Sequence, residues 1–238
     1  MEICIYFKSE KLSELIDGLR LLKIRKPISV GDSEKRLKKD VSLDDNASLN
    51  TFLEKNSVGF FMHGQGCLYD VSLSEGKYSV LHIYPTGDIT DIDWAIAVFE
   101  TIQGALPQFG YVSTSEEFKH RNRLVVNQGN NNVESWVGRD LNKYIPGLYS
   151  ITLLSNEQLD EKKVDINSLK RSSQTYTCYE NFVLFTFSKD IEQWSKDRDN
   201  VDSVCLAEEG VFSKQYIEEK ALKTSNFIEL NMLTSNWK

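Results

Sequence analysis

The sequence predicts an α+β fold in which mainly antiparallel sheets are packed by helices. Three strand-like segments, 58–63, 67–73 and 78–84, are separated by short links that contain glycine. Such links favour hairpins, so the three segments are expected to form an antiparallel meander. The 238 residues are 40% hydrophobic and 11% aromatic, which is enough apolar material for a core. This composition excludes disorder, collagen and a coiled coil as the main architecture.

The N-terminal part of the chain predicts a strand followed by an amphipathic helix. Ile3, Ile5 and Phe7 alternate with other residues, which is typical of a strand. Ser9 then stands before the helix as its candidate N-cap. Apolar residues spaced for one helix face follow at Leu12, Leu15, Ile16, Leu19 and Leu22. Residues 25–50 are polar and are expected to form a loop or a solvated helix.

A second helix is predicted after the meander. Thr90 is its candidate N-cap, and Asp91 and Asp93 stand in its first turn, where carboxylates are favourable. The helix is expected to stop before Pro107, since the residue before a proline avoids the helical conformation. Trp94 lies on the apolar side of this helix and is expected to belong to the core.

The second half loosely repeats the order of strand, Ser/Thr cap with acids, helix and further strands. The expected strands are 109–112, 148–154, 176–179 and 182–187. One helix is expected after Ser113 or Thr114 as its N-cap, and two more are expected over 137–144 and 215–222. Residues 127–132 are rich in Asn and predict a turn or loop. Two similar lobes, 1–106 and 107–238, would fit this order, but no aligned identity supports a duplication. We therefore expect a single α+β domain over 1–238.

The cysteines and the N-terminus predict a cytoplasmic protein. Cys4, Cys67, Cys178 and Cys205 are scattered, with neither a C-x-x-C pair nor a spacing typical of a metal site. A chain of this length whose first residues lack secretion-signal features is expected to keep its thiols reduced and mostly buried. No run of 18 apolar residues occurs, so no membrane span is predicted.

The charge is unevenly distributed along the chain. The net charge is −7, from 28 basic and 35 acidic residues, which argues against generic binding to a nucleic-acid backbone. Residues 51–106 hold seven acidic and two basic residues, a balance of −5. The acidic residues of this segment are Glu54, Asp70, Glu75, Asp88, Asp91, Asp93 and Glu100. A negative field of this kind steers a cationic protein partner, although the same acids also cap helices and keep a surface soluble.

Motifs of common catalytic and cofactor-binding sites are absent from the sequence. It contains no phosphate loop, no dinucleotide-binding fingerprint, no H-E-x-x-H helix and no G-x-S-x-G elbow. His63 and His82 each lie near a predicted strand end and could meet across a sheet, with Asp70 or Asp88 as a carboxylate partner. Structural histidines are commoner than such sites, so neither a metal nor a cofactor is predicted.

Two further groups in the second half are candidates for a functional role. Glu116 and His120 fall on one helix face, an arrangement suited to proton transfer but commoner as an exposed ion pair. Trp136 lies beside the Asn-rich loop and is a candidate interface anchor, since Trp is enriched at binding hot spots; core packing is its other expected role. The basic residues with aromatic neighbours are Arg121, Arg123 and Arg139. Because no net basic face is expected around them, no nucleic-acid partner is predicted.

Several short motifs are similar to those of a known bacterial family. The first motif is Phe109-Gly110-Tyr111-Val112, which follows a helix and Pro107. The second is Tyr144-Ile145-Pro146-Gly147-Leu148-Tyr149, which leads into an apolar strand. A late strand is expected over 182–187. This order resembles bacterial immunity proteins of polymorphic toxins and of type VI secreted toxins, especially the family numbered fifty-two among immunity proteins. The similarity covers residues 80–220. Tyr179-Glu180-Asn181 stands where such proteins commonly have a Gly pair before the late strand.

The resemblance implies a non-catalytic protein that binds a cognate secreted toxin in the producing cell and blocks its active site. Many such toxins are nucleases with basic clefts, for which an acidic surface is a fitting counterpart. From the charge pattern we expect the interface to include some of Asp70, Glu75, Asp88 and Asp91, with Trp136 as a candidate apolar anchor. Whether the protein is a monomer or a homodimer stays open. The alternatives are a structural or adaptor module, and a hydrolase that uses His63 or His82 with a carboxylate.

Overall fold

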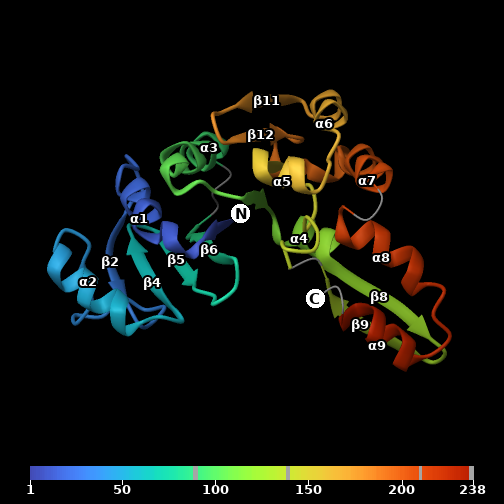
Figure 1. Ribbon diagram of the computed structural model, residues 1–238, viewed down its shortest axis with the longest axis horizontal. Helices are drawn as coiled ribbons and strands as arrows, with labels where there is room; N and C mark the ends of the chain where they lie inside the picture. Colours follow the sequence, from blue (N-terminus) through green and yellow to red (C-terminus); the bar gives the residue numbers. More distant parts are fainter. Residues whose placement is uncertain (88–90, 138–139, 209–210, 236–238) are drawn as a thin grey trace. The chain divides into compact units, whose positions relative to one another are not determined.

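The computed structural model describes residues 1–87, 91–137, 140–208 and 211–235, without the side chains of Ser213, Gln215 and Tyr216 (Figure 1). The fold class is α+β, as predicted. The chain forms two compact units. The first comprises Met1–Val112, Leu153–Ser155 and Tyr179–Phe182, and the second comprises Ser113–Thr152, Asn156–Cys178 and Val183–Lys238.

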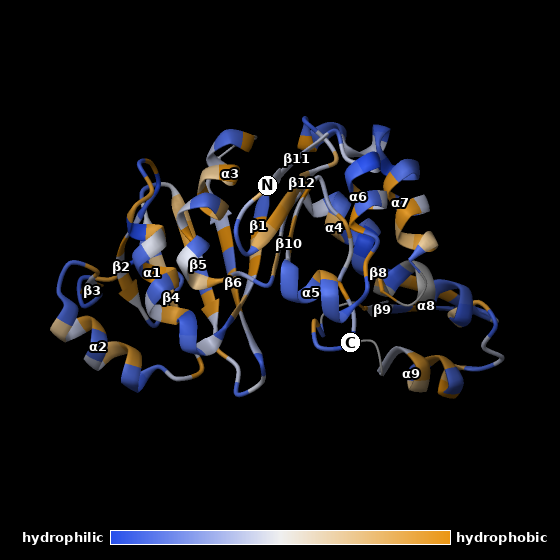
Figure 2. Ribbon diagram, turned by 45° about the horizontal axis from the view of Figure 1, so that its top comes forward, coloured by the Kyte–Doolittle hydropathy of each residue, from blue (hydrophilic) through white to orange (hydrophobic). Residues whose placement is uncertain are grey.

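The first unit is built on a sheet whose strands follow the order β7-β1-β6-β5-β4-β2-β3. The strands are β1 (Glu2–Lys8), β2 (Pro27–Gly31), β3 (Val41–Ser42), β4 (Gly59–Gly64), β5 (Cys67–Ser72), β6 (Tyr78–Pro85) and β7 (Phe109–Ser113). The predicted antiparallel meander is confirmed as β4, β5 and β6. The predicted N-terminal strand is β1, which pairs antiparallel with β6. Figure 2 shows hydrophobic residues along these strands, as expected for a sheet that contributes to a core.

Residues 25–50 differ from the expected loop or solvated helix. They contain β2, β3 and the start of α2 (Asn46–Lys55). Val30 of β2 is buried and pairs with Met62 of β4, so a core strand forms within a polar stretch. Asp45 begins α2 by accepting a hydrogen bond from Ser48 N at 3.1 Å. The expectation was wrong because pairing with a neighbouring strand decides strand formation where the local pattern is weak.

The first helix buries the predicted apolar face. After η1 (Ser9–Lys11), α1 (Leu12–Arg20) buries Leu15, Ile16 and Leu19. Ser9 does not cap this helix, contrary to the prediction. Its hydroxyl lies 2.7 Å from that of Ser79 on β6, so it fixes the start of the helix against the sheet instead.

The second predicted helix is α3 (Ile92–Thr101), followed by η2 (Gln103–Ala105). Asp91 caps α3 by accepting a hydrogen bond from Trp94 N at 3.0 Å. The predicted cap Thr90 lies outside the described residues. Trp94 is buried, as expected from its place on the apolar side of the helix.

Gly18 marks a close approach between α1 and the end of α3. A Cβ at Gly18 would lie 2.4 Å from the backbone oxygen of Thr101. Replacing Gly by Ala at an exposed position inside a helix raises the free energy of unfolding by about 1 kcal/mol. At Gly18, however, α1 would have to move away from the end of α3 to make room for the methyl group. We expect Gly18→Ala to lower the free energy of unfolding by about 1–3 kcal/mol in urea titrations. The control is Gly104→Ala, whose Cβ would meet nothing within 4 Å; equal losses for the two variants would contradict this explanation.

The described part of the second unit contains β11 (Thr175–Cys178), most of β12 (Phe182–Thr186), the first two residues of β10 (Ile151–Ser155), a separate hairpin and several helices. β12 lies between β11 and β10, and β8 (Arg123–Gln128) pairs antiparallel with β9 (Asn131–Trp136). The helices are α4 (Ser115–Asn122), α5 (Asn156–Glu161), α6 (Ile166–Ser172), η3 (Ile191–Lys196), α7 (Arg198–Ala207), α8 (Ser213–Ala221) and α9 (Phe227–Ser235). The predicted late hairpin is confirmed as β11 and β12, and the predicted helix over 215–222 is confirmed as α8.

The helix predicted over 137–144 was wrong for the residues that the structure describes there. Residues 141–143 form a turn, in which Asp140 accepts a hydrogen bond from Asn142 N at 3.1 Å. Such local bonds from Asp side chains compete with helix formation. The predicted loop over 127–132 is the end of the β8–β9 hairpin, whose strands the sequence did not indicate.

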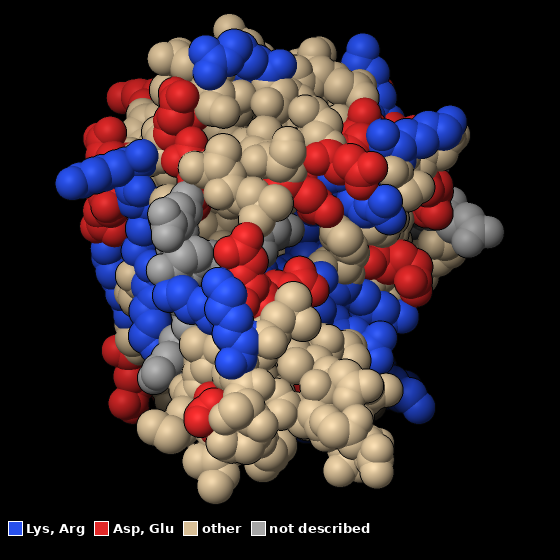
Figure 3. Space-filling model, turned by 90° about the vertical axis from the view of Figure 1, so that its right-hand side faces the viewer, with Lys and Arg blue, Asp and Glu red and all other residues tan. Residues whose placement is uncertain are grey.

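One face of this hairpin packs on α8 and α9. The buried cluster between them contains Leu124, Val126, Val137, Ile217, Ala221 and Leu230. A two-stranded hairpin alone is marginally stable, so this packing is what holds it in the unit. The other side of α9 exposes Phe227, Ile228 and Met232. Figure 3 shows few charges in its lower part, on the side of the molecule where α9 lies.

All four cysteines are free. Cys4, Cys67 and Cys205 are buried, and Cys178 is exposed on β11. Burial raises the pKa of the Cys67 and Cys205 thiols to about 12, so both stay protonated at neutral pH. None of the helices in the described part of the chain has the length and apolar character that crossing a membrane requires.

Candidate functional site

The predicted acidic interface residues lie at separate places on the first unit. Asp70 is half-buried on β5, and Glu75 is exposed in the turn between β5 and β6. Asp91 is exposed at the N-terminus of α3, beyond the opposite end of β6. β6 has eight residues, and a strand of that length spans roughly 25 Å. Glu75 and Asp91 therefore do not share one patch, and Asp88 lies outside the described residues.

Asp70 belongs to a row of polar side chains across three strands. In the pairing register, His82 of β6 stands between Asp70 of β5 and Cys4 of β1. Its Nδ1 lies 2.8 Å from Oε1 of Glu2, and its ring stacks on that of Tyr84 with centroids 5.9 Å apart. Directly opposed residues place their side chains on one sheet face. The row thus brings an imidazole and two carboxylates together on that face.

The charges of this row are coupled. The sulfur of Cys4 and the carboxylate of Glu2 raise the pKa of His82 above its usual range, against the effect of burial. Burial raises the pKa of Asp70, while His82 opposes this shift and Glu34 adds to it. Cys4 and Glu2 therefore favour the protonated form of His82. A general base must be unprotonated to accept a proton, so the protonated form of His82 is not suited to act as the base of a hydrolase.

His63 is not part of this row. It lies on β4 opposite Leu68, and β5 separates it from His82, so the two histidines do not meet across the sheet. His63 is buried, and its Nε2 lies 3.0 Å from the backbone oxygen of Ser33. Its Nδ1 lies 3.4 Å from Oδ2 of Asp40. These contacts fix the loop after β2, which is a structural role.

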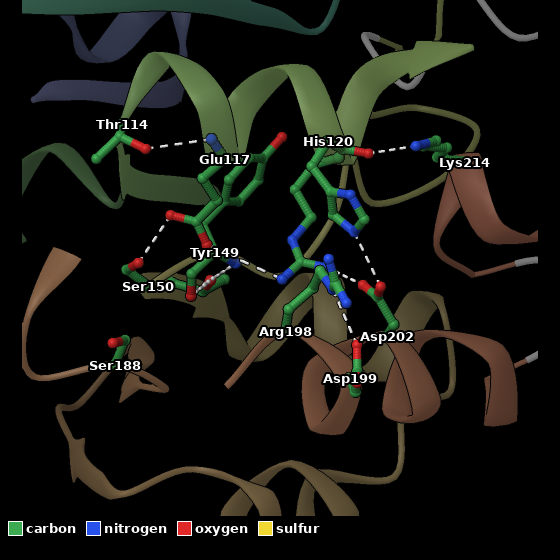
Figure 4. Close-up of polar contacts among 12 residues, drawn as sticks. Thr114, Glu117, His120, Tyr149, Ser150, Ser188, Arg198, Asp199, Asp202 and Lys214 are labelled. Carbon is green, nitrogen blue, oxygen red and sulfur yellow. Dashed lines mark hydrogen bonds and ion pairs between the residues drawn. The ribbon is translucent and has the colours of Figure 1, made fainter. Parts of the chain in front are cut away.

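The second unit contains a buried ionic cluster, here called the Arg121 cluster (Figure 4). It consists of Glu117, His120, Arg121, Asp202 and Lys214. Arg121 of α4 is 1% exposed, and its guanidinium donates to the carboxylate of Asp202 on α7. Its Nη2 lies 4.0 Å from Oε1 of Glu117, one turn earlier on α4. A buried guanidinium is tolerated only with such partners, because an unpaired buried charge is strongly destabilising.

Glu117 is the most perturbed carboxyl group of the cluster. The hydroxyl of Ser150 donates to its Oε2 at 2.7 Å, as Figure 4 shows. Its backbone N–H donates to the hydroxyl of Thr114, the N-cap of α4, which confirms one of the two predicted caps. Burial raises the pKa of Glu117 to about 7, although Arg121 and Ser150 favour the charged form. This carboxyl group therefore titrates near neutral pH.

The remaining members join α4 to α7 and α8. Nε2 of His120 lies 2.9 Å from Oδ2 of Asp202. Burial disfavours the charge of Asp202, but the hydrogen bond from His120 and the charge of Arg121 hold its pKa below the usual range. Lys214 of α8 donates to the backbone carbonyl of His120, and burial lowers the pKa of Lys214. Three helices are thus held by one set of charges.

A surface hollow of about 430 Å³ lies beside the cluster. Its lining residues are Glu116, Lys119, His120, Arg123, Val125, Trp194, Lys214 and Glu218. Lys119 pairs with Glu116 at 3.0 Å, and Arg123 pairs with Glu134 at 2.6 Å. Glu116 is thus engaged by Lys119, and His120 has Asp202 as its carboxylate partner rather than Glu116. The paired charges leave the hollow without a strong excess of either sign.

Trp136, the candidate anchor, is half-buried near the end of the β8–β9 hairpin. Its ring stacks on Phe118 of α4, with centroids 5.6 Å apart and planes inclined by 21°. The residue opposite Trp136 on β8 is Arg123. Part of the indole therefore packs within the unit and part is accessible to solvent, and the role of Trp136 as an interface anchor stays a prediction.

Sequence reasoning missed Glu117 and Asp202 as members of an ionic cluster. Glu117 and Arg121 are spaced i, i+4, a signal that could have indicated a pair on one helix face. Asp202 stands 81 residues after Arg121 and carries no local signal of this contact. Within the described residues, no group of three or more His, Cys, Asp or Glu side chains could hold a metal ion.

Comparison with known proteins adds one fold relationship. No protein family and no curated protein matches the sequence. The fold is similar to that of the solved structure of Pseudomonas aeruginosa T6SS protein PA0821, with a TM-score of 0.53 and 13% sequence identity. The match covers 99% of this chain and 81% of that chain. The chain thus shares the fold of a type VI secretion system protein.

Proposed function

We propose that this protein is an immunity protein that binds a cognate secreted toxin in the cytoplasm of the producing cell and blocks its active site without catalysis. The observation that carries the proposal is the fold likeness to a T6SS protein over 99% of this chain. The short motifs around Pro146 and the late strand β12, which resemble those of toxin immunity proteins, support the same function.

The placement of the acidic residues supports a basic partner. Five of the acidic residues within 51–106 are exposed, and Asp70 is half-buried. The exposed ones are Glu54, Glu75, Asp91, Asp93 and Glu100. Spread over the first unit, they act as a field that accelerates encounter with a cationic surface rather than as one contact patch. Trp136 provides a half-exposed aromatic ring of the kind found at interface centres.

The test is co-expression with the toxin encoded by the neighbouring gene. Cells that produce the toxin alone should stop growing, and cells that also produce this protein should grow. Size-exclusion chromatography of the purified mixture should show a stable complex of fixed stoichiometry. Absence of both protection and complex would refute the proposal, whereas a complex without protection would favour an adaptor module.

We expect charge reversal to slow association with the toxin. The triple variant Glu54→Lys, Glu75→Lys and Asp93→Lys should lower the association rate constant about tenfold at low salt, because long-range steering is lost. The dissociation rate should change little, and the difference should shrink at about 0.5 M salt, where charges are screened. Stopped-flow or surface plasmon resonance measures both rates.

The matched control reverses three exposed acids of the second unit. These are Asp160, Glu192 and Glu219, so the net charge changes by the same amount. The control variant should associate at nearly the wild-type rate if steering depends on the first unit. Equal slowing by both triple variants would show that only total charge matters, and would remove the acidic segment from the proposal.

A further inference from the structure

A basic hollow lies on the first unit of this acidic protein. It has a volume of about 570 Å³ and lies where the loop between α1 and β2 meets the turn between β4 and β5. Its lining residues are Lys23, Ile24, Arg25, Lys26, Ile28, Gln65, Gly66 and Thr86. Three of these are cations, and none of the described lining residues is acidic. The net charge of the whole chain is −7, so this local excess of positive charge is a distinct feature.

Arg25 is held in an unusual backbone conformation at the hollow. Its φ is 57°, in the left-handed region that residues other than glycine rarely adopt. The hydroxyl of Tyr69 donates to the backbone oxygen of Arg25 at 2.6 Å. Its guanidinium donates from Nη1 to the backbone oxygen of Gly66 at 3.2 Å and lies 5.4 Å from the ring centroid of Trp94. Strain that surrounding contacts maintain in this way is typical of binding and catalytic positions.

The loop and the sheet are in direct contact below Arg25. A Cβ at Gly64 would lie 2.6 Å from the backbone oxygen of Arg25 and 2.8 Å from that of Lys26. Only glycine permits this approach, so the loop lies against the end of β4. The walls of the hollow are therefore formed before any ligand arrives, which reduces the cost of ordering on binding.

The cations of the hollow have donors available for a ligand. Lys23 and Lys26 are exposed and form no ion pair with any residue that the structure describes. A guanidinium has five N–H donors, and the bond to Gly66 uses Nη1 alone. Ile24 and Ile28, which are 53% and 39% exposed, lie among these cations. The hollow thus combines positive charge with apolar surface.

We propose that this hollow binds an acidic polypeptide segment of a partner protein in which carboxylates alternate with apolar side chains. The guanidinium of Arg25 and the ammonium groups of Lys23 and Lys26 bind the carboxylates, and Ile24 and Ile28 contact the apolar side chains. Charge complementarity selects this occupant. The cations are spread along an open loop with apolar residues between them, which suits an extended chain better than a single compact phosphate.

The test uses a fluorescein-labelled heptapeptide of alternating glutamate and isoleucine, titrated with the full-length protein in fluorescence anisotropy. Arg25→Gly is the decisive variant, because glycine adopts the left-handed conformation without strain and the fold is retained. We expect this variant to weaken binding about tenfold or more, since it removes a charge-assisted contact. The double variant Lys23→Ala and Lys26→Ala should weaken binding similarly.

The control is the double variant Lys35→Ala and Arg36→Ala, which removes two exposed cations outside the hollow. It should bind the peptide within about twofold of the wild type. Equal affinity of the wild type and Arg25→Gly, or no binding of the peptide by the wild type, would overturn the proposal. Binding of inorganic pyrophosphate at this hollow without binding of the peptide would overturn it as well, in favour of a phosphate ligand. None of these outcomes depends on the proposed toxin.

Discussion

Replacing Arg121 by alanine is expected to lower the free energy of unfolding by about 3–5 kcal/mol. The guanidinium is buried and pairs with Asp202, and Glu117 lies 4.0 Å away. Its removal leaves a cavity and two acidic groups without their cation. Urea unfolding followed by circular dichroism measures the loss. Hydrogen exchange at the amides of α4 and α7 then assigns the loss to the second unit.

The control for this prediction is Arg198→Ala. Arg198 lies at the start of α7 and pairs with Asp199, but it is half-exposed, so the loss should stay below about 1 kcal/mol. Replacing the pair by apolar residues, as in Arg121→Met with Asp202→Leu, should recover part of the stability, because Glu117 is then the one carboxyl group of the two that has lost its cation. A loss below about 1 kcal/mol for Arg121→Ala would contradict the role assigned to the cluster.

The stability of the second unit is expected to depend on the protonation of Glu117. Burial raises the pKa of this carboxyl group from 4.5 to about 7 in the folded protein. Between these values the unfolded chain has lost the proton and the folded chain retains it, so the free energy of unfolding falls as the pH rises. The contribution lost between about pH 4.5 and pH 7 is about 3 kcal/mol. Relative to Glu117→Gln, the wild type should therefore lose that much stability across this range.

Glu117→Gln removes the titration and keeps an oxygen that can accept the hydrogen bond of Ser150. Urea unfolding of both proteins at a series of pH values measures the difference in the free energy of unfolding, which cancels the pH dependence that the two proteins share. The control is Glu116→Gln on the same helix, whose side chain is 74% exposed and should leave the slope unchanged. A constant difference between wild type and Glu117→Gln across the pH range would show that Glu117 is ionised in the folded state throughout.

The elements with a strong local pattern were predictable from the sequence. Glycine-containing links between alternating segments indicated β4, β5 and β6, and spacing close to 3.6 residues indicated α1. In contrast, β2 and the β8–β9 hairpin were missed because their formation depends on partners. β2 ends at Gly31 and pairs with β4, which begins only at Gly59. The β8–β9 hairpin needs α8 and α9 to cover one of its faces.

The functional residues were less predictable than the fold. The sequence indicated an acidic segment, but its members Glu75 and Asp91 lie beyond opposite ends of β6. It gave no sign that the left-handed Arg25 would be fixed by Tyr69, a residue 44 positions later. His82 was a candidate base, and its neighbours Glu2 and Cys4 from the N-terminal strand instead favour its protonated form.

By itself, the sequence determined the α+β class, the strands of the meander and the excess of negative charge, because these follow from composition and from patterns within a few residues. Only the tertiary structure decided which charges meet. Asp202 reaches Arg121 across 81 residues, and burial then brings the pKa of Glu117 close to neutral pH. Coulomb energies and desolvation depend on distance in space and on exclusion of water, and neither quantity can be read from positions along the chain.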